Sequence, residues 1–308
     1  MRAEVARIDN NKITCRYIGD FTDLGFTEFK ALSNPSSDDF TFCVPEVPEA
    51  GIVEIGLYAH AEGKDTIAYG NYGHAEGRST LAGNYGHAEG RGTRALSYGH
   101  AEGLNSKADG TYSHAEGQDT QALGANSHTE GEKTQALGAN SHAQGVKTIA
   151  QGPGSHAEGY GTIPSGNYSH AEGSTTKAIG DGSHAEGQGT KAEGYLSHAE
   201  GYETQAIGTA AHTEGYGTIA EASYMHASGC WNKTIKTTED GNSVLFVIGN
   251  GTGIDNRHDA CVIDYSGNAW FAGVIETPAI ILRSSTPGST KKFKITVDDT
   301  GNLSTAEI

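Results

Sequence analysis

The central part of the chain alternates small and polar residues with a period of two, which is the pattern of β-strands. In the run S-H-A-E-G over residues 155–159, the serine, alanine and glycine share one face of the expected strand, and His156 and Glu158 share the other. Because the first face carries only small side chains, it can approach another backbone closely. We therefore expect this face to point inward and the His/Glu face to point outward.

A second alternating run follows each first run after a short turn of two or three residues. In T-K-A-E-G over residues 190–194, the threonine, alanine and glycine share the inward face, whereas Lys191 and Glu193 point outward. Two faces made of such small side chains can close on each other only as a thin, flattened solenoid. Successive rungs of that solenoid would pair about 4.8 Å apart.

The pair of runs repeats along more than half of the chain. The interval between histidines is 14 residues, except for two steps of 13 that each lack one residue in the turn after the second strand. The sequence therefore predicts an all-β fold, a parallel β-roll solenoid of about 13 fourteen-residue rungs that is roughly 60 Å long. The repeated histidines are His60, His74, His87, His100, His114, His128, His142, His156, His170, His184, His198, His212 and His226.

Variation between the copies separates constrained positions from free ones. The glycine after H-A-E is present in all thirteen copies and the glutamate in eleven, whereas the outward residues of the second strand change freely. Solvent does not enforce identity, so we expect the His/Glu face to meet the same face of another chain, with each buried charge paired. The expected interface residues are His74, Glu76, His114, Glu116, His156, Glu158, His170, Glu172, His184, Glu186, His198 and Glu200.

Two other uses of the His/Glu face stay open. Imidazole and carboxylate both bind divalent metals, but one chain offers only one histidine per rung, so we expect no metal and no cofactor. The face could also sense pH. A glutamate partner would raise the histidine pKa and add stability below about pH 6.5, whereas burial of neutral histidine would lower the pKa and remove stability as the pH falls.

Composition and charge narrow the class of protein. Hydrophobic residues make up 35% of the 308 residues and 44 residues are glycine, so a thin roll buries little apolar area and favours oligomerisation. The net charge of −17 argues against partners that carry phosphate, so we expect no nucleic acid and no membrane insertion. The four cysteines lie far apart and match neither a disulfide framework nor a zinc site.

The unit S-H-A-E-G-x-x-T-x-A-x-G resembles the S-V-A-I-G-x-x-x-x-A-x-G repeat of trimeric autotransporter adhesin heads, the YadA-like heads. This resemblance implies a left-handed parallel β-roll and a homotrimer around a threefold axis. Histidine and glutamate stand where that family has valine and isoleucine, the outward pair that faces neighbouring chains. The H-A-E-G variant is similar to repeats in phage tail and fibre proteins of Gram-positive hosts, and the segments Phe246–Gly253, Ile263–Gly273 and Ile281–Ile295 also resemble parts of phage structural proteins.

The regions beside the repeats divide the chain into three expected domains. Residues 1–57 would form an N-terminal β capping or attachment module, with strands at Ile13–Ile18 and Phe40–Val44 and a connector at Val44–Gly51. Residues 58–232 would form the β-roll, and residues 233–308 a β-rich trimerisation or tip module. Hairpin turns are expected at Asp264–Asn268 and Asp298–Asn302.

Tyrosines recur at one turn of the repeat, two residues before the histidine. They would either pack against their neighbours one rung away or form a ladder that contacts glycans. The candidate glycan contacts are Tyr72, Tyr85, Tyr98, Tyr112 and Tyr168.

These features favour a structural and recognition protein over an enzyme. The sequence contains no G-x-S-x-G, H-E-x-x-H or Walker motif, and catalysis needs one special pair of groups rather than thirteen copies. We expect a phage fibre or spike in the virion that attaches to a glycan or protein of the host surface and joins other virion components through a terminal module. Two alternatives stay open: a trimeric adhesin of a bacterial cell surface, and a monomeric ice-binding-like solenoid, which would need its threonines to face outward.

Overall fold

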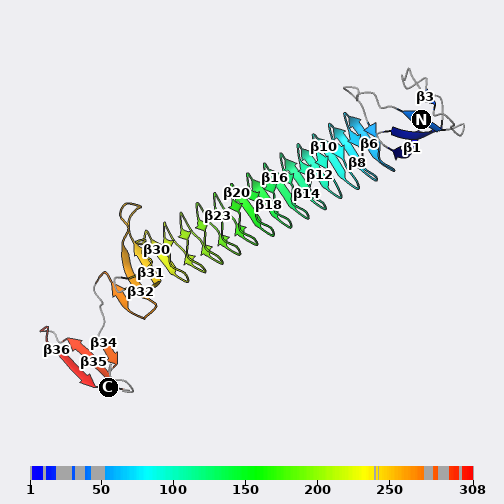
Figure 1. Cartoon of the computed structure of the whole chain (residues 1–308). Helices are drawn as coiled ribbons and strands as arrows, with labels where there is room; N and C mark the ends of the chain where they lie inside the picture. The colour runs from blue at the N-terminus through cyan, green and yellow to red at the C-terminus, as the bar shows by residue number, and fades with distance from the viewer. Residues whose placement is uncertain are drawn as a thin grey trace.

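The computed structural model describes residues 2–9, 12–18, 30–31, 39–42, 53–238, 241, 243–273, 280–283, 291–297 and 300–307. Within these ranges the regular structure is β-strand, and the long middle part is a parallel β-solenoid drawn as a straight rod (Figure 1). The described ranges include no helix that is long and apolar enough to cross a membrane. The predicted all-β solenoid with a spacing of about 14 residues is confirmed.

The first strand of every rung belongs to one sheet, in which each histidine pairs with the histidine of the next rung. Thirteen such strands give about twelve full turns. They are β6 (His60–Lys64), β8 (His74–Arg78), β10 (His87–Arg91), β12 (His100–Leu104), β14 (His114–Gln118), β16 (His128–Glu132), β18 (His142–Val146), β20 (His156–Tyr160), β22 (His170–Ala171), β24 (His184–Ala185), β26 (His198–Ala199), β28 (His212–Thr213) and β30 (His226–Cys230).

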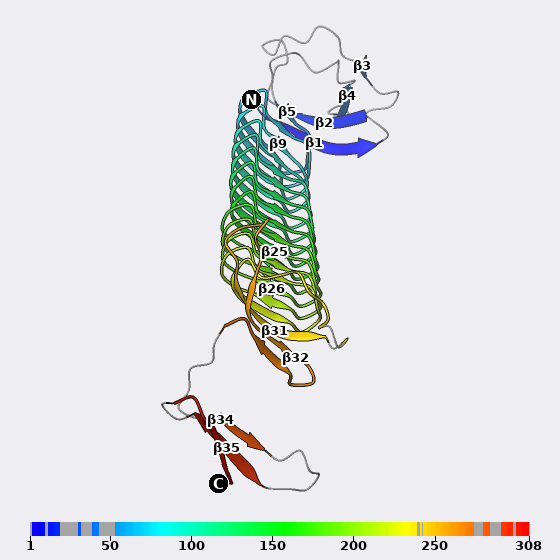
Figure 2. The same ribbon diagram turned by 90° about the vertical axis from the view of Figure 1, so that its left-hand side faces the viewer.

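The second strands form the opposite wall of the roll in two consecutive parallel sheets. Figure 2, turned by 90° from Figure 1, shows the two walls and their turns stacked rung upon rung along the rod. The first of these sheets contains β5 (Val53–Glu54), β7 (Ile67–Ala68), β9 (Leu81–Ala82), β11 (Arg94–Ala95), β13 (Lys107–Ala108), β15 (Gln121–Ala122), β17 (Gln135–Ala136) and β19 (Ile149–Ala150). The second contains β21 (Ile163–Pro164), β23 (Lys177–Ala178), β25 (Lys191–Ala192), β27 (Gln205–Ala206) and β29 (Ile219–Ala220).

The space between the two walls is filled by the small residues that the alternation assigns to the inside. Ala157, Ala192 and Thr190 are fully buried, and Ser155 is 1% exposed. In six of the seven rungs with a serine before the histidine, the serine hydroxyl donates to the carbonyl of the glycine three residues before it, as Ser113 does to Gly110. The threonine column therefore lies inside the roll, which confirms the inward register and removes the outward threonine face that an ice-binding solenoid needs.

Steric contact between rungs explains why the glycine after H-A-E never varies. Gly117 has a φ of +115°, which side chains rarely adopt. A Cβ on Gly117 would also lie 2.1 Å from the carbonyl oxygen of Gly131 in the next rung. Every non-glycine residue at this position would therefore both strain the backbone and collide with the neighbouring rung.

The flanking strands make three further groups. At the N-terminal end of the rod, an antiparallel sheet contains β1 (Arg2–Asp9), β2 (Lys12–Ile18), β4 (Asp39–Phe42) and β3 (Lys30–Ala31). The strand expected at Ile13–Ile18 lies within β2, and residues 40–42 of the strand expected at Phe40–Val44 lie in β4, whereas the connector expected at Val44–Gly51 lies outside the described residues. The histidine sheet continues past residue 232 into β31 (Val244–Asn250), β32 (Asp259–Asp264) and β33 (Ala269–Phe271). A separate antiparallel sheet contains β34 (Ile280–Arg283), β35 (Lys292–Val297) and β36 (Leu303–Glu307).

The two expected hairpin turns differ in how far the structure describes them. The Asp264 carboxylate accepts hydrogen bonds from the backbone N–H groups of Ser266 and Asn268, which closes the first turn between β32 and β33. Residues 298 and 299 of the second turn lie outside the described ranges.

Candidate functional site: the histidine–glutamate face

The outward histidines form one continuous column of stacked imidazole rings. Because the strands pair in parallel and in register, each ring lies one rung from its equivalent, and neighbouring centroids are 4.7–4.8 Å apart from His74 to His226. The planes of consecutive rings lie within 13° of each other from His74 to His212. All six histidines expected at the interface lie in this column.

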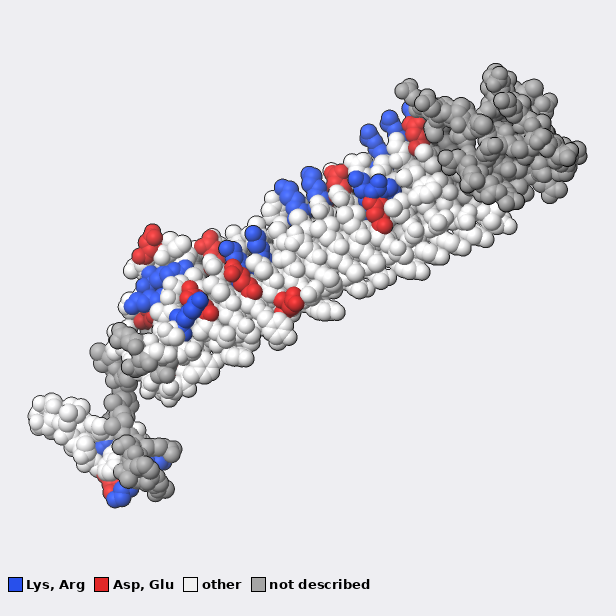
Figure 3. All heavy atoms as spheres, viewed as in Figure 1, with Lys and Arg blue, Asp and Glu red and all other residues white. Residues whose placement is uncertain are grey.

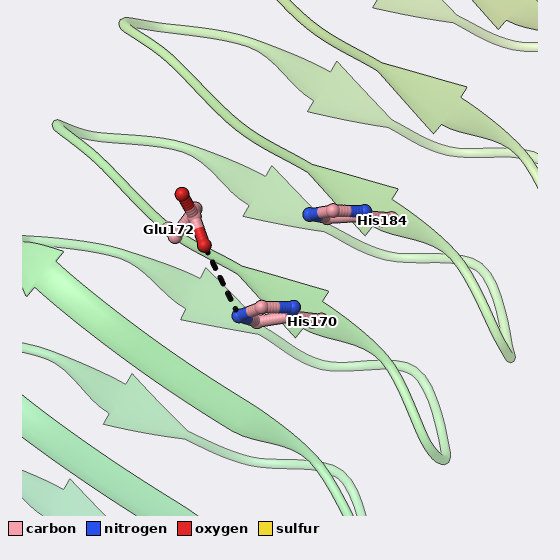
Figure 4. A group of neighbouring side chains, drawn as sticks. All are labelled: His170, Glu172 and His184. Carbon is pink, nitrogen blue, oxygen red and sulfur yellow. Dashed lines mark ion pairs between the residues drawn. The ribbon is translucent and has the colours of Figure 1, made fainter.

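The glutamates form a second column beside the histidines, because residues i and i+2 of a strand share a face. The Nε2 atom of His170 lies 3.7 Å from an Oε atom of Glu172 (Figure 4). Further along the rod, Glu200 lies between two rings, with oxygens 4.0 Å from the Nε2 of His198 and 3.8 Å from the Nε2 of His212. Both columns remain partly exposed, so such pairs contribute little stability in a single chain.

The histidine column has unused hydrogen-bonding capacity. From His74 to His226, the Nε2 atom of each of twelve rings is buried and makes no hydrogen bond. The nearest carboxylates stand 3.5–4.0 Å away where an ion pair occurs, slightly beyond hydrogen-bonding range in most cases. A buried polar atom without a partner costs free energy, so a modest movement of the glutamates or a second surface would stabilise this face.

Burial lowers the pKa of several imidazoles in the column. The pKa of His142 is lowered to about 4, first by desolvation and then by the neighbouring rings of His128 and His156, against the opposing effect of Glu158. Burial is also the main reason why the pKa is lowered at His74, His114, His170, His198 and His212. Of the two signs considered for a pH response, the single chain therefore favours loss of stability as the pH falls.

Three overlapping groups bring possible metal ligands within 4.8 Å of one another, each with two histidines from adjacent rungs and one glutamate. Sequence reasoning counted one histidine per rung and did not consider that stacking brings a second one near. The rings of His184 and His198 are nearly parallel, at 2°, and 4.8 Å apart. Since Zn–N bonds are about 2.0–2.1 Å, two such rings could share one ion only after tilting toward each other. The groups are His170–Glu172–His184, His184–Glu186–His198 and His198–Glu200–His212.

A shallow groove of about 400 Å³ runs along the glutamate column near its C-terminal end. Its walls are Glu186, Glu200 and Glu214 together with the backbone of the glycine column. Because glycine has no side chain, this strip of backbone forms the floor of the groove, and another surface can approach it. The groove is therefore acidic and has a period of one rung.

The tyrosines form a second ladder at the turn before the histidines. Rings from Tyr58 to Tyr112 stack with centroids 4.7–5.2 Å apart, as expected if each packs against its neighbour one rung away. Their backbones adopt the left-handed conformation, for example with φ +55° at Tyr98. Stacking covers the ring faces within the ladder. Tyr168 is different, because it is 79% exposed and its neighbours at the same turn are Gly154 and Gly182.

The comparisons with known proteins agree with this architecture. Residues 115–141 and 143–169 each match the YadA head domain repeat. This part of the rod is similar to the YadA head domain repeat. No curated protein matches the chain. The match relates this part of the rod to the heads of adhesin-like structural proteins.

At the C-terminal end of the rod lies a cluster that the repeat pattern did not predict. The ring of Trp231 packs edge-on against Tyr216, and the Arg257 guanidinium lies over Trp231 at 4.9 Å. The same guanidinium donates to the backbone carbonyls of Gly217 and Asn232. Arg257 lies outside the repeat, so the period of the sequence could not predict this cluster.

Proposed function

We propose that the chain is the subunit of a homotrimeric phage fibre or spike that presents a rigid rod for attachment to a host surface. The observation that carries this proposal is the His/Glu face. The histidine is present in all thirteen rungs and the glutamate in eleven, and twelve histidine nitrogens on this face lack hydrogen-bond partners within the chain. A surface of this kind fits two further copies of itself, because each rung then brings three histidines and three glutamates together.

The rest of the rod varies as expected for a surface that faces solvent or a receptor. In Figure 3, lysine and arginine side chains gather along one long edge, and the middle of the visible face carries little charge. The basic residues Lys64, Arg78 and Arg91 follow the invariant glycine in consecutive rungs and pair in register. These positions change along the chain, in contrast to the His/Glu face, so they are free to adapt to a partner.

Among the five proposed glycan contacts, Tyr168 is the one best placed to hold a sugar. Sugars stack on aromatic faces, and the faces of Tyr72, Tyr85 and Tyr98 are covered by their neighbours on both sides. Only glycines flank Tyr168 at its turn. We expect Tyr168→Ala to weaken binding to host-surface polysaccharide on a glycan array, while Tyr98→Asn leaves it unchanged. Equal loss with both variants would contradict this assignment.

The proposed trimer is tested by the solution mass of the full chain. Light scattering at neutral pH, without cross-linker, should give three times 32.1 kDa. A monomer would overturn the proposal and leave the His/Glu face as an exposed ligand-binding surface.

A bacterial cell-surface adhesin is the second candidate, favoured by the match to the YadA head domain repeat. Antibodies against the chain would show whether the protein lies on virions or on the surface of bacterial cells. Gold label on purified virions would support the phage fibre, whereas label on cells that carry no phage would support the adhesin.

A further inference from the structure

The sheet that carries the His/Glu face ends in a patch of different chemistry. Strand β31 pairs in parallel with β30, so that Phe246 continues the histidine column after His226 and Ile248 continues the glutamate column after Ser228. The ring of Phe246 lies 5.3 Å from that of His226. The polar pair that repeats along the rod is therefore replaced by an apolar pair in the same two columns.

Strands β32 and β33 extend this apolar surface sideways. Cross-strand partners in an antiparallel sheet share a face, so the register places Ile248, Cys261 and Phe271 in one row and Phe246, Ile263 and Ala269 in a second row. No charged residue is present in either row. We call these six residues the apolar end patch.

The two faces of this part of the sheet differ in how well they are covered. On the inner face, Val247 is fully buried and Val262 packs against the same core. On the outer face, Ile248 is 38% exposed and Phe271 is 53% exposed. The inner face of β31 and β32 is thus filled by the chain itself, while Ile248 and Phe271 of the apolar end patch stay open in the single chain. Cys261 between them is 8% exposed, and Trp270 on the inner side of β33 is 40% exposed.

We propose that the apolar end patch is the hydrophobic part of the contact between copies of this chain, and this inference rests on the proposed trimer. Copies related by rotation about an axis along the rod place each residue at the height of its equivalents. Any arrangement that joins the His/Glu faces in this way also brings the patches together, because both belong to one continuous sheet. The polar columns then fix register, and burial of the patch drives association.

The test compares two identical substitutions in the full chain. Ile248→Asp puts a charge in the apolar end patch, whereas the control Ile254→Asp changes an isoleucine that is 68% exposed and lies outside both rows. Light scattering at micromolar concentration should show monomer for Ile248→Asp and trimer for the control. Circular dichroism should show the β-signal of the parent in both, and if Ile248→Asp does not fold, Phe271→Ser on the edge strand is measured in the same way.

The outcomes separate this inference from the proposed function. A trimeric parent with a trimeric Ile248→Asp and Phe271→Ser would overturn the role of the apolar end patch and leave the fibre proposal standing. Loss of binding to host cells by these trimeric variants would overturn it in favour of a receptor as the occupant. A monomeric parent would overturn the trimer itself.

Discussion

At the scale of single residues, the choice of amino acid is most restricted at the glycine that follows H-A-E. This glycine has a positive φ, and its backbone lies so close to the next rung that a Cβ atom would clash with a carbonyl oxygen there. Other turn positions also have positive φ but open space, as at Gly189, where a Cβ would lie 3.5 Å from the Glu203 side chain. These positions accept tyrosine, asparagine, lysine or leucine in other rungs. Close approach, rather than backbone conformation alone, therefore decides which glycines are fixed.

Two glycine-to-alanine variants test this distinction. We expect Gly117→Ala to lower the free energy of unfolding by roughly 3 kcal/mol or more, because backbone strain adds to a steric clash. The matched variant Gly189→Ala should cost about 1 kcal/mol, since only the left-handed conformation opposes it. Denaturant unfolding followed by circular dichroism measures both, and equal losses would contradict the role of the clash.

The inward placement of alanine and threonine was predictable at this scale, because alternation in a strand leaves only two faces and only small residues fit inside. The Arg257–Trp231 contact was not predictable, because Arg257 lies outside the repeat and no period relates it to Trp231 in the last rung. The near approach of histidines from adjacent rungs followed from the spacing, but the orientation of the rings depends on packing that the pattern does not encode.

At the scale of the element, each rung repeats the chemistry of its neighbour, and the columns act together. Thirteen parallel strands convert one histidine per unit into a continuous stack, in which burial and neighbouring rings lower the pKa of His142, His170 and His212. A column of imidazoles thus lies beside a column of carboxylates. A charge placed on one ring is felt by the rings above and below it.

This coupling predicts a pH response with a definite sign. The lowered pKa values mean that the unfolded chain binds more protons than the folded chain between about pH 6.5 and about 4, so stability is complete above that window and falls as the pH drops through it. Melting temperatures between pH 8 and 5 should stay level at first and then decrease below about pH 6.5. A melting temperature that does not change with pH would contradict the lowered histidine pKa values. A maximum at pH 5 would show that the glutamates raise the histidine pKa more than burial lowers it.

Substitution of one ring identifies the source of the pH effect. His142→Gln removes the histidine whose pKa is lowered to about 4 and should reduce the slope of melting temperature against pH. His258→Gln changes the one histidine outside the column and should leave the slope unchanged. Equal slopes for the parent and both variants would exclude the column as the titrating element.

The tyrosine ladder makes a separate prediction. Tyr98 stacks on Tyr85 and Tyr112, and asparagine occupies the equivalent turn at Asn126 and Asn140 with the same left-handed backbone. Tyr98→Asn should therefore keep the turn and lose two stacking contacts, at a cost of about 1–3 kcal/mol in thermal or denaturant unfolding. No loss of stability would mean that the ladder contributes no packing energy.

At the scale of the whole molecule, the repeated unit indicated the rod, while the ends gave weaker signals. A period of 14 residues with two alternating runs leaves the β-roll as the fitting architecture, and the pairing of β6 to β30 confirms it. The continuation of the sheet through β31 to β33 could not be counted from the period, because Phe246 and Ile248 break the H-A-E-G motif while keeping its register.

Removal of one complete unit tests the modular character of the rod. Deletion of residues 128–141 joins Ser127 to His142 and should give a folded protein with nearly the parent's melting temperature and a rod about 4.8 Å shorter. Deletion of residues 128–134 removes half a unit and should disrupt the roll, because it places strand residues against turns. Circular dichroism and limited proteolysis would show whether the two deletions differ in this way.

The two short rungs, in which the turn lacks one residue, have a consequence for how such a chain changes over generations. His74, His87 and His100 remain paired across these rungs, so the missing residue is absorbed entirely at a corner. Genetic duplication or loss of a unit can then lengthen or shorten the rod without disturbing either end. The length of the rod becomes a heritable quantity that evolves in steps of one rung, independently of the sequences at its two ends.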